Sequence, residues 1–118
     1  MNLFICYDGC STCRKAEAWL KANGVAYEKR PIKEQNPSAE ELRLWQARSS
    51  LPLRRFFNTS GMLYRERRLS ERLPGMSEEE MLAELASDGM LVKRPLLVTD
   101  TAVIPGFKEE SWRAVLGL

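Results

Sequence analysis

Two cysteines separated by two residues, Cys10 and Cys13, have the residue type and spacing that favour chemistry in this sequence. They lie in the stretch Tyr7-Asp8-Gly9-Cys10-Ser11-Thr12-Cys13-Arg14-Lys15, between a short apolar run and a segment with helical periodicity. A Cys-x-x-Cys pattern at a strand-to-helix turn is typical of thiol redox chemistry. Cys10 is the predicted nucleophile, because the unpaired N–H groups and the positive dipole end of the following helix stabilise a thiolate.

The other residues of this motif are assigned supporting roles. Cys13 lies about one helical turn further on, close enough to attack a sulfur adduct on Cys10. Arg14 adds positive charge, and Ser11 and Thr12 complete the turn. The structural alternative is that the two thiols only pack and perform no chemistry.

The absence of histidine narrows the chemistry further. It excludes Cys-His and Ser-His-Asp machinery as well as histidine metal ligands. The third cysteine, Cys6, lies in the apolar run and is predicted to be a buried packing residue. No metal site is expected.

The composition indicates one globular domain that covers residues 1–118. The chain has 118 residues, of which 44% are hydrophobic and 29% charged, and its net charge of +2 does not argue for nucleic-acid or membrane binding. The basic stretch around Arg54-Arg55 and Arg65–Arg68 is interspersed with acids and is interpreted as a solvated face. No apolar run approaches the ~20 residues of a membrane span, and the first residues do not resemble a signal peptide. We therefore expect a cytoplasmic protein.

The order of the predicted elements indicates the fold class. Leu3–Cys6 and Val25–Arg30 are predicted strands with a helix between them, which ends at Asn23-Gly24. Capping boxes at Ser38 and Ser77 predict helices, and Asn58 is expected to serve the C-terminal end of a short helix. Two more predicted strands, Leu96–Val98 and Ala102–Ile104, precede a last helix with Trp112. This order predicts an α/β, thioredoxin-like fold: a mixed four-stranded sheet flanked by helices, with a helical insertion at about residues 38–90.

Four stretches carry a resemblance to a known family. They are Cys10-Ser-Thr-Cys-Arg-Lys-Ala, Phe56-Phe57-Asn58-Thr59-Ser60-Gly61, Leu91-Val92-Lys93-Arg94-Pro95-Leu96 and Gly106-Phe107-Lys108-Glu109. With these stretches the sequence resembles the arsenate reductase (ArsC) family of thioredoxin-like proteins, which also contains the regulator Spx. The resemblance is greatest to the short, uncharacterised arsenate-reductase-like members. It implies a cis peptide bond before Pro95, packed against the active-site turn.

The resemblance also implies roles for site residues. In the family's reductases the thiolate at the position of Cys10 attacks arsenate, glutathione attacks the adduct, and arginines hold the oxyanion. Arg94 matches one of these arginines. A second falls where this chain has Asn58, and no arginine stands at the third position near Pro105-Gly106-Phe107, although Lys108 is nearby. These differences argue against arsenate as the natural substrate.

Two function hypotheses of different classes follow from the resemblance. The first is a thiol-dependent oxidoreductase that acts on a small oxyanion or disulfide. It would use glutathione, a glutaredoxin or a thioredoxin as reductant, without a tightly bound cofactor, a membrane or direct nucleic-acid binding. The alternative is a redox-sensing regulator like Spx that binds the C-terminal domain of the RNA polymerase α subunit, although the chain ends before the longer C-terminal segment of Spx. A third interpretation is a fold whose thiols no longer turn over.

Overall fold

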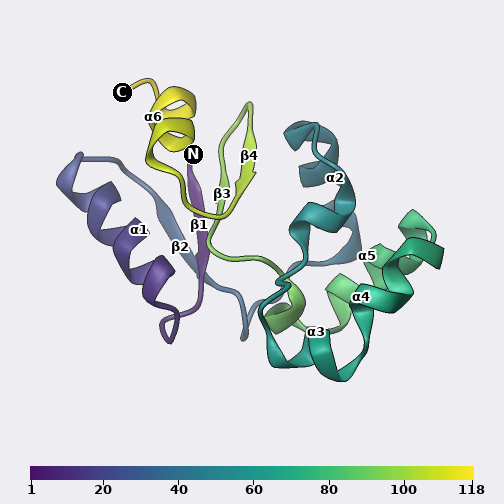
Figure 1. Ribbon diagram of the computed structural model, residues 1–118. Coiled ribbons are helices and arrows are strands. Elements are labelled where there is room, and N and C mark those ends of the chain that lie inside the picture. Colours follow the sequence, from purple (N-terminus) through teal and green to yellow (C-terminus); the bar gives the residue numbers. More distant parts are fainter.

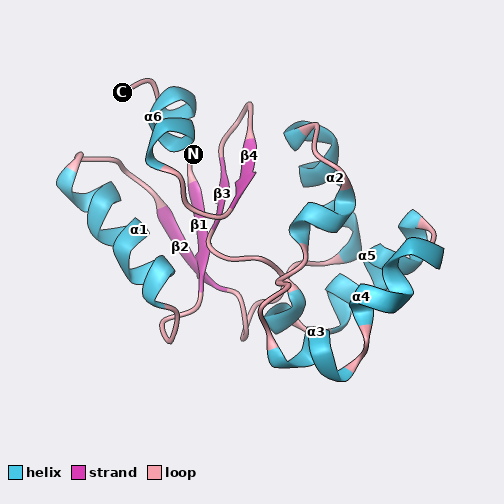
Figure 2. Ribbon diagram, in the orientation of Figure 1, coloured by secondary structure: helices cyan, strands magenta, loops and turns pink.

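A computed structural model describes all residues, 1–118, and contains a small sheet with helices on both sides (Figures 1 and 2). The strands are β1 (Leu3–Cys6), β2 (Glu28–Pro31), β3 (Leu96–Val98) and β4 (Val103–Pro105). The α-helices are α1 (Ser11–Ala22), α2 (Ala39–Ser49), α3 (Met62–Glu66), α4 (Leu69–Arg72), α5 (Glu78–Ser87) and α6 (Glu109–Leu116). Short 3-10 helices span Leu53–Phe56, Leu73–Gly75 and Gly89–Leu91. None of these helices combines the length and the apolar character that crossing a membrane requires.

The sheet is mixed, with the strand order β2-β1-β3-β4. β1 and β2 run parallel, and the β1–β3 and β3–β4 pairs are antiparallel. The predicted mixed four-stranded sheet is therefore confirmed. The second strand begins at Glu28 rather than at Val25, because pairing can start only where β1 does: Leu3 lies opposite Glu28, and Cys6 lies opposite Pro31.

The alternation of side chains along the strands divides the core between the two faces of the sheet. Phe4 and Cys6 of β1 and Leu97 of β3 pack on the face covered by α1 and α6, where Trp112 is fully buried. Ile5, Leu96 and Val98 point to the opposite face, which the helices between β2 and β3 cover (Figure 1). Both faces are thus sealed by apolar contacts, which provide most of the stabilisation of such a fold.

In the helical segment between β2 and β3, capping boxes begin two of the helices and an ion pair joins the segment to the sheet. Ser38 and Ser77 form the capping boxes expected from the sequence, with Glu41 and Glu80 as the reciprocal partners. Arg30 at the end of the sheet forms a bidentate pair with Glu41, with N–O distances of 2.6 and 2.8 Å. This pair fixes α2 against β2.

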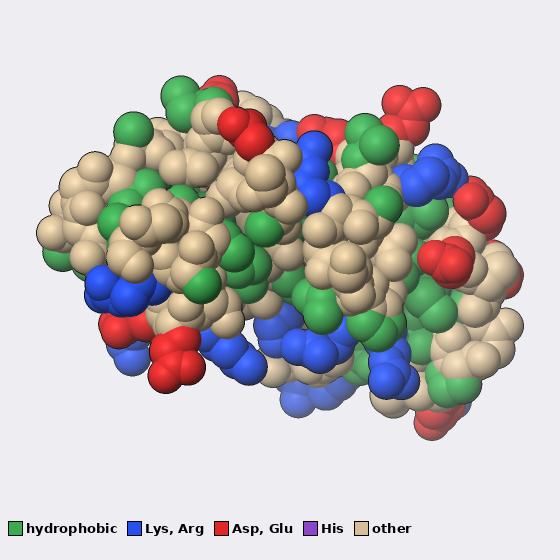
Figure 3. Space-filling model, turned by 90° about the horizontal axis from the view of Figure 1, so that it is seen from above, with side chains coloured by type: hydrophobic (Ala, Val, Ile, Leu, Met, Phe, Trp, Pro, Cys, Tyr) green, Lys and Arg blue, Asp and Glu red, His purple; other side chains and the backbone are tan.

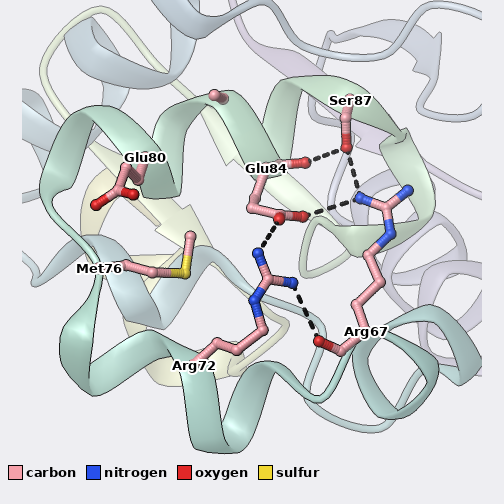
Figure 4. A pocket seen from close by; sticks show the side chains of 7 residues that line it. Arg67, Arg72, Met76, Glu80, Glu84 and Ser87 are labelled. Carbon is pink, nitrogen blue, oxygen red and sulfur yellow. Dashed lines mark hydrogen bonds and ion pairs between the residues drawn. The ribbon is translucent and has the colours of Figure 1, made fainter.

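A second ion-pair cluster joins α4 to α5. Glu84 on α5 accepts hydrogen bonds from Arg72 at 2.6 Å and from Arg67 at 2.9 Å (Figure 4). Arg67 also contacts the hydroxyl of Ser87, and Arg72 donates to the backbone carbonyl of Arg67. Although a surface pocket lies beside these residues, their charges are already satisfied by one another.

Short backbone contacts connect two segments that are distant in the sequence. Phe57 and Val92 form an isolated antiparallel bridge. The Asn58 N–H donates to the Leu91 carbonyl at 2.8 Å, and the Lys93 N–H donates to the Phe56 carbonyl at 2.7 Å. These contacts place the end of the first 3-10 helix beside the segment that leads into β3. Arg94 lies in that segment.

Candidate functional site

Cys10 lies between β1 and α1, at the N-cap of the helix. Its backbone N–H donates to the Tyr7 carbonyl at 3.0 Å, and its carbonyl accepts from the Arg14 N–H at 3.1 Å. The Arg14 guanidinium also donates to the Asp8 carbonyl at 2.8 Å. These bonds hold the turn in place, and the Cys10 side chain is left half-buried.

Cys13 lies one turn into α1 and faces the core. It is 2% exposed, and its sulfur accepts the Tyr7 N–H at 3.4 Å. Cys6 is buried in the same apolar cluster, as predicted for a packing residue. Of the three thiols, only that of Cys10 is accessible.

The three thiols have different acidities. Burial pushes the pKa of Cys10 up, but the backbone N–H groups of Cys13 and Thr12, the Cys13 thiol and the charge of Arg94 outweigh this effect and lower the pKa. Cys10 is the N-cap of α1, where the positive end of the helix dipole also favours a thiolate. Burial raises the pKa of Cys13 to about 12 and that of Cys6 to about 11. The site therefore pairs a stabilised thiolate with a protonated thiol one turn away.

Arg94 is held over the active-site turn from the segment before β3. Its guanidinium carbon lies 5.3 Å from the centre of the Tyr7 ring, and Nη1 donates to the carbonyls of Met90 and Val92 at 3.3 and 3.4 Å. Nε is buried and has no partner. No carboxylate pairs with Arg94, so its positive charge is available to an anion at Cys10.

The peptide bond between Arg94 and Pro95 is cis, as the resemblance implies. Pro95 is buried at the start of β3, and its carbonyl accepts the Gly106 N–H at 2.8 Å. This bond brings the end of β4 beside Arg94.

Cys10 opens into a cleft of about 570 Å³. Its lining contains four cationic side chains and no carboxylate, and the polar and cationic members are Thr12, Arg55, Asn58, Ser60, Lys93, Arg94 and Lys108. Figure 3 shows Lys and Arg side chains gathered in the hollow between two lobes at its lower edge, with no Asp or Glu side chain among them. This lining favours the binding of an anionic ligand.

One wall of the cleft contains two residues that the sequence analysis interpreted differently. Arg55 was assigned to a solvated face, but it lines the cleft from the 3-10 helix Leu53–Phe56. Asn58 was expected to end that helix, but the helix ends earlier, at Phe56. Backbone pairing with Leu91 draws Asn58 into the cleft, where its amide reaches the Met90 carbonyl at 3.5 Å. A contact between segments more than thirty residues apart gives no local sequence signal.

The opposite wall is fixed by aromatic packing. The indole N–H of Trp112 donates to the Gly106 carbonyl at 2.9 Å, and the Phe107 ring packs edge-on against Trp112 with centroids 4.9 Å apart. Gly106 has a φ of +86°, and a Cβ there would lie 3.0 Å from the Lys93 side chain. The Lys93 side chain therefore passes close to Gly106 on this wall, although Lys93 is exposed.

Most of the predicted site residues meet at one place. Cys10, Thr12 and Arg94 line the same cleft, with Cys13 directly below and Pro95 beside them. Two supporting residues have other positions: Arg14 holds the turn from outside, and Ser11 is exposed and does not line the cleft. Arg55 and Lys93, which also line the cleft, were not predicted as site residues from the sequence.

Comparison with known proteins places the chain in a family. The model of the ArsC family matches residues 6–115. The uncharacterised protein YusI of Bacillus subtilis is 51% identical over 109 residues, which cover 92% of each chain. The global transcriptional regulator Spx of Enterococcus faecalis is 23% identical over 107 residues, covering 91% of this chain and 80% of the regulator.

A solved structure extends the comparison to three dimensions. A crystal structure of a possible arsenate reductase from Streptococcus mutans UA159 matches with a TM-score of 0.87 and 42% identity, covering 95% of this chain and 97% of the other. The thioredoxin-like fold expected from the sequence is thereby confirmed. The relatives include both a possible reductase and a regulator, and on these matches the chain belongs to the ArsC family.

Proposed function

We propose that this protein is a thiol-dependent oxidoreductase that acts on a negatively charged substrate, with Cys10 as the nucleophile. The observation that carries the proposal is the contrast between the thiols: the pKa of Cys10 is lowered, whereas those of its two neighbours are raised. The thiolate is the attacking form of cysteine, so reactivity is concentrated at one sulfur. That sulfur faces a cleft with cationic side chains and no carboxylate.

On a disulfide substrate, the Cys10 thiolate attacks one sulfur and forms a mixed disulfide. The other sulfur leaves as a thiolate that takes a proton from water, and Arg94 stabilises the negative charge as it leaves. Cys13 then loses its proton and attacks the Cys10 sulfur, which releases the second thiol and leaves a Cys10–Cys13 disulfide. Two electrons from an external dithiol restore both thiols.

On an oxyanion such as arsenate, the Cys10 thiolate displaces an oxygen, which leaves as water after protonation. A second thiol, from Cys13 or glutathione, then attacks the Cys10 sulfur, and the arsenic keeps the electron pair of the broken bond and leaves as arsenite. Arg94 and the N-terminus of α1 stabilise the anion in both steps.

The reductant belongs to the same proposal. Glutathione with a glutaredoxin, or a thioredoxin in the cytoplasm, would supply the two electrons. The exposed turn around Cys10 is accessible to such a partner, because Ser11, Thr12 and Arg14 are all exposed. No tightly bound cofactor takes part in these steps.

The test is NADPH oxidation coupled separately through glutaredoxin and thioredoxin, with arsenate and a small disulfide as substrates. We expect turnover with at least one substrate and loss of all turnover in Cys10→Ser. Cys13→Ser should stop turnover through thioredoxin if resolution is internal, and preserve turnover with glutathione if it is external. Equal activity of the parent and Cys10→Ser would refute the proposal.

A regulator is the second candidate function, supported by the similarity to Spx. In this alternative, the state of Cys10 and Cys13 controls binding to the C-terminal domain of the RNA polymerase α subunit. A pull-down of the α subunit under reducing and oxidising conditions tests it. Binding that changes with oxidation and is lost in Cys10→Ser, in a chain without turnover, would favour the regulator.

A further inference from the structure

Four cations line the cleft, and the charge of one of them, Arg94, lowers the pKa of Cys10. The other three, Arg55, Lys93 and Lys108, are exposed and come from three different segments, namely the first 3-10 helix, the segment that leads into β3, and the turn before α6. None of the three forms an ion pair, whereas Arg30, Arg67 and Arg72 all do.

The cleft has a larger volume than a tetrahedral oxyanion would fill. The five heavy atoms of such an oxyanion occupy roughly 150 Å³, judged from the ≈30 Å³ that one water takes in the liquid. The cleft encloses about 570 Å³. The remaining space lies among cations, so the part of a ligand that does not react would also be negatively charged.

We propose that Arg55, Lys93 and Lys108 form a carboxylate subsite, which selects disulfides with acidic substituents. This inference rests on the proposed function, because Cys10 performs the sulfur chemistry. The Cys10 thiolate attacks one sulfur of R–S–S–R, the other R–S leaves as a thiolate and is protonated by water, and the carboxylates of both halves face the three cations. Arg94 acts on the sulfurs, and the subsite acts on the substituents.

The position of Lys93 supports the separation into two functions. Its side chain lies against Gly106, where a Cβ would approach Lys93 Cε to 3.0 Å. Lys108 follows two residues after Gly106 on the same wall. Arg55 lines the same cleft from the 3-10 helix, so cations from separate segments surround the space for a bound carboxylate.

Three small disulfides of different charge test the subsite by the same sulfur chemistry: dithiodiglycolate with two carboxylates, neutral hydroxyethyl disulfide, and cationic cystamine. The loss of reduced Cys10 is followed by quenching and mass spectrometry, and each rate is divided by the rate of a free small thiol. We expect the order dithiodiglycolate, hydroxyethyl disulfide, cystamine, with the preference weakened by salt.

The variant Arg55→Gln/Lys93→Gln/Lys108→Gln should lower the preference for dithiodiglycolate over hydroxyethyl disulfide about tenfold. Its rate with the neutral disulfide should stay within about twofold of the parent. Lys21→Gln/Lys33→Gln/Arg65→Gln is the matched control, because it removes the same charge from exposed positions that do not line the cleft. An equal loss of preference in both variants, or no loss in the cleft variant, would overturn the subsite.

A binding measurement separates failure of the subsite from failure of the proposed function. Calorimetric titration of Cys10→Ser with dithiodiglycolate should show binding that the three additional glutamines abolish. Binding in Cys10→Ser, together with an unreactive Cys10 in the parent, would leave the subsite in place and refute the oxidoreductase. An absence of binding would refute the subsite even if Cys10 reacts.

Discussion

The cations beside α5 and the cations of the cleft have opposite surroundings. Arg67 and Arg72 converge on Glu84, and each of the three side chains is satisfied by the others (Figure 4). In the cleft, Arg94 has a buried Nε without a partner, and no carboxylate lies among the lining residues. The same residue type thus serves two purposes in one small chain.

The paired charges beside α5 and the unpaired charges of the cleft have opposite effects on the stability of the folded state. Paired charges gain modest stability, about 0.2–1 kcal/mol for exposed pairs. Unpaired like charges repel one another and favour a bound anion that relieves the repulsion. We infer that the α5 cluster holds the helical segment together, whereas the cleft keeps its charge available for a ligand.

The largest expected contrast is between Arg94→Met and Arg72→Met. Arg94→Met should raise the pKa of Cys10 and slow its reaction with iodoacetamide at neutral pH severalfold, because less of the sulfur is then thiolate. Arg72→Met should leave this rate unchanged and lower the free energy of unfolding by about 0.5–1 kcal/mol. Alkylation kinetics and urea denaturation measure the two effects. A similar loss of reactivity in both variants would contradict the division between the clusters.

The ion pair between Arg30 and Glu41 should make stability depend on acidity. Hydrogen bonds from Arg30 lower the pKa of Glu41 from 4.5 to about 2, against the effect of burial. Because the folded state prefers the ionised carboxylate, the pair stabilises the folded state fully above pH 4.5, and this stabilisation disappears as the pH falls towards 2. The Glu41 side chain is 36% exposed, so we expect only about 1 kcal/mol after screening by solvent.

Glu41→Gln keeps an amide oxygen for the capping box and removes the charge. Urea denaturation of the parent and this variant across that pH range should show a difference that narrows as the pH falls. A difference that stays constant down to the lowest pH would show that the carboxylate charge is not responsible.

A smaller effect is expected from the support under Arg94. The Tyr7 ring lies next to the Arg94 guanidinium and also next to Gly9, where a Cβ would approach Tyr7 Cε2 to 2.6 Å. Tyr7→Leu removes the aromatic face and should slow Cys10 alkylation about threefold at neutral pH, as a cation–π contact of about 0.5–1 kcal/mol allows. Tyr7→Phe keeps the ring and should react like the parent.

The pH profile of alkylation distinguishes this positioning role from a general loss of structure. Tyr7→Leu should shift the profile of Cys10 towards higher pH without changing its plateau. A lower plateau at an unchanged midpoint would show that Tyr7 affects access to the sulfur instead of its acidity.

The sequence predicted the parts of the fold that depend on local signals. The serine capping boxes, the glycine after α1 and the apolar strands all act within a few residues, and the four-stranded mixed sheet follows from their order. The predicted second strand began too early because its start depends on pairing with β1, which lies more than twenty residues away.

The residues of the candidate site also fall into those that were predicted from the sequence and those that were not. The Cys-x-x-Cys motif was identified because it is contiguous in the sequence, and Arg94 and Pro95 were identified because they match a short family motif. Arg55 and Lys93 were missed because backbone pairing between Phe57 and Val92 brings their segments together. Three cations that are separated in the sequence resemble ordinary surface charge until the fold assembles them.

A stabilised thiolate at Cys10 is the central claim. The most direct test is the rate of iodoacetamide alkylation at each cysteine, measured by mass spectrometry as a function of pH. We expect Cys10 to titrate below its ordinary pKa of 9.0, while Cys6 and Cys13 become reactive only near 11 and 12. Cys10→Ser should remove the early titration and leave Cys6 and Cys13 as thiols that react only at high pH, because burial is the main cause of their raised pKa values. A Cys10 that titrates at or above 9.0, together with the other thiols, would contradict the account.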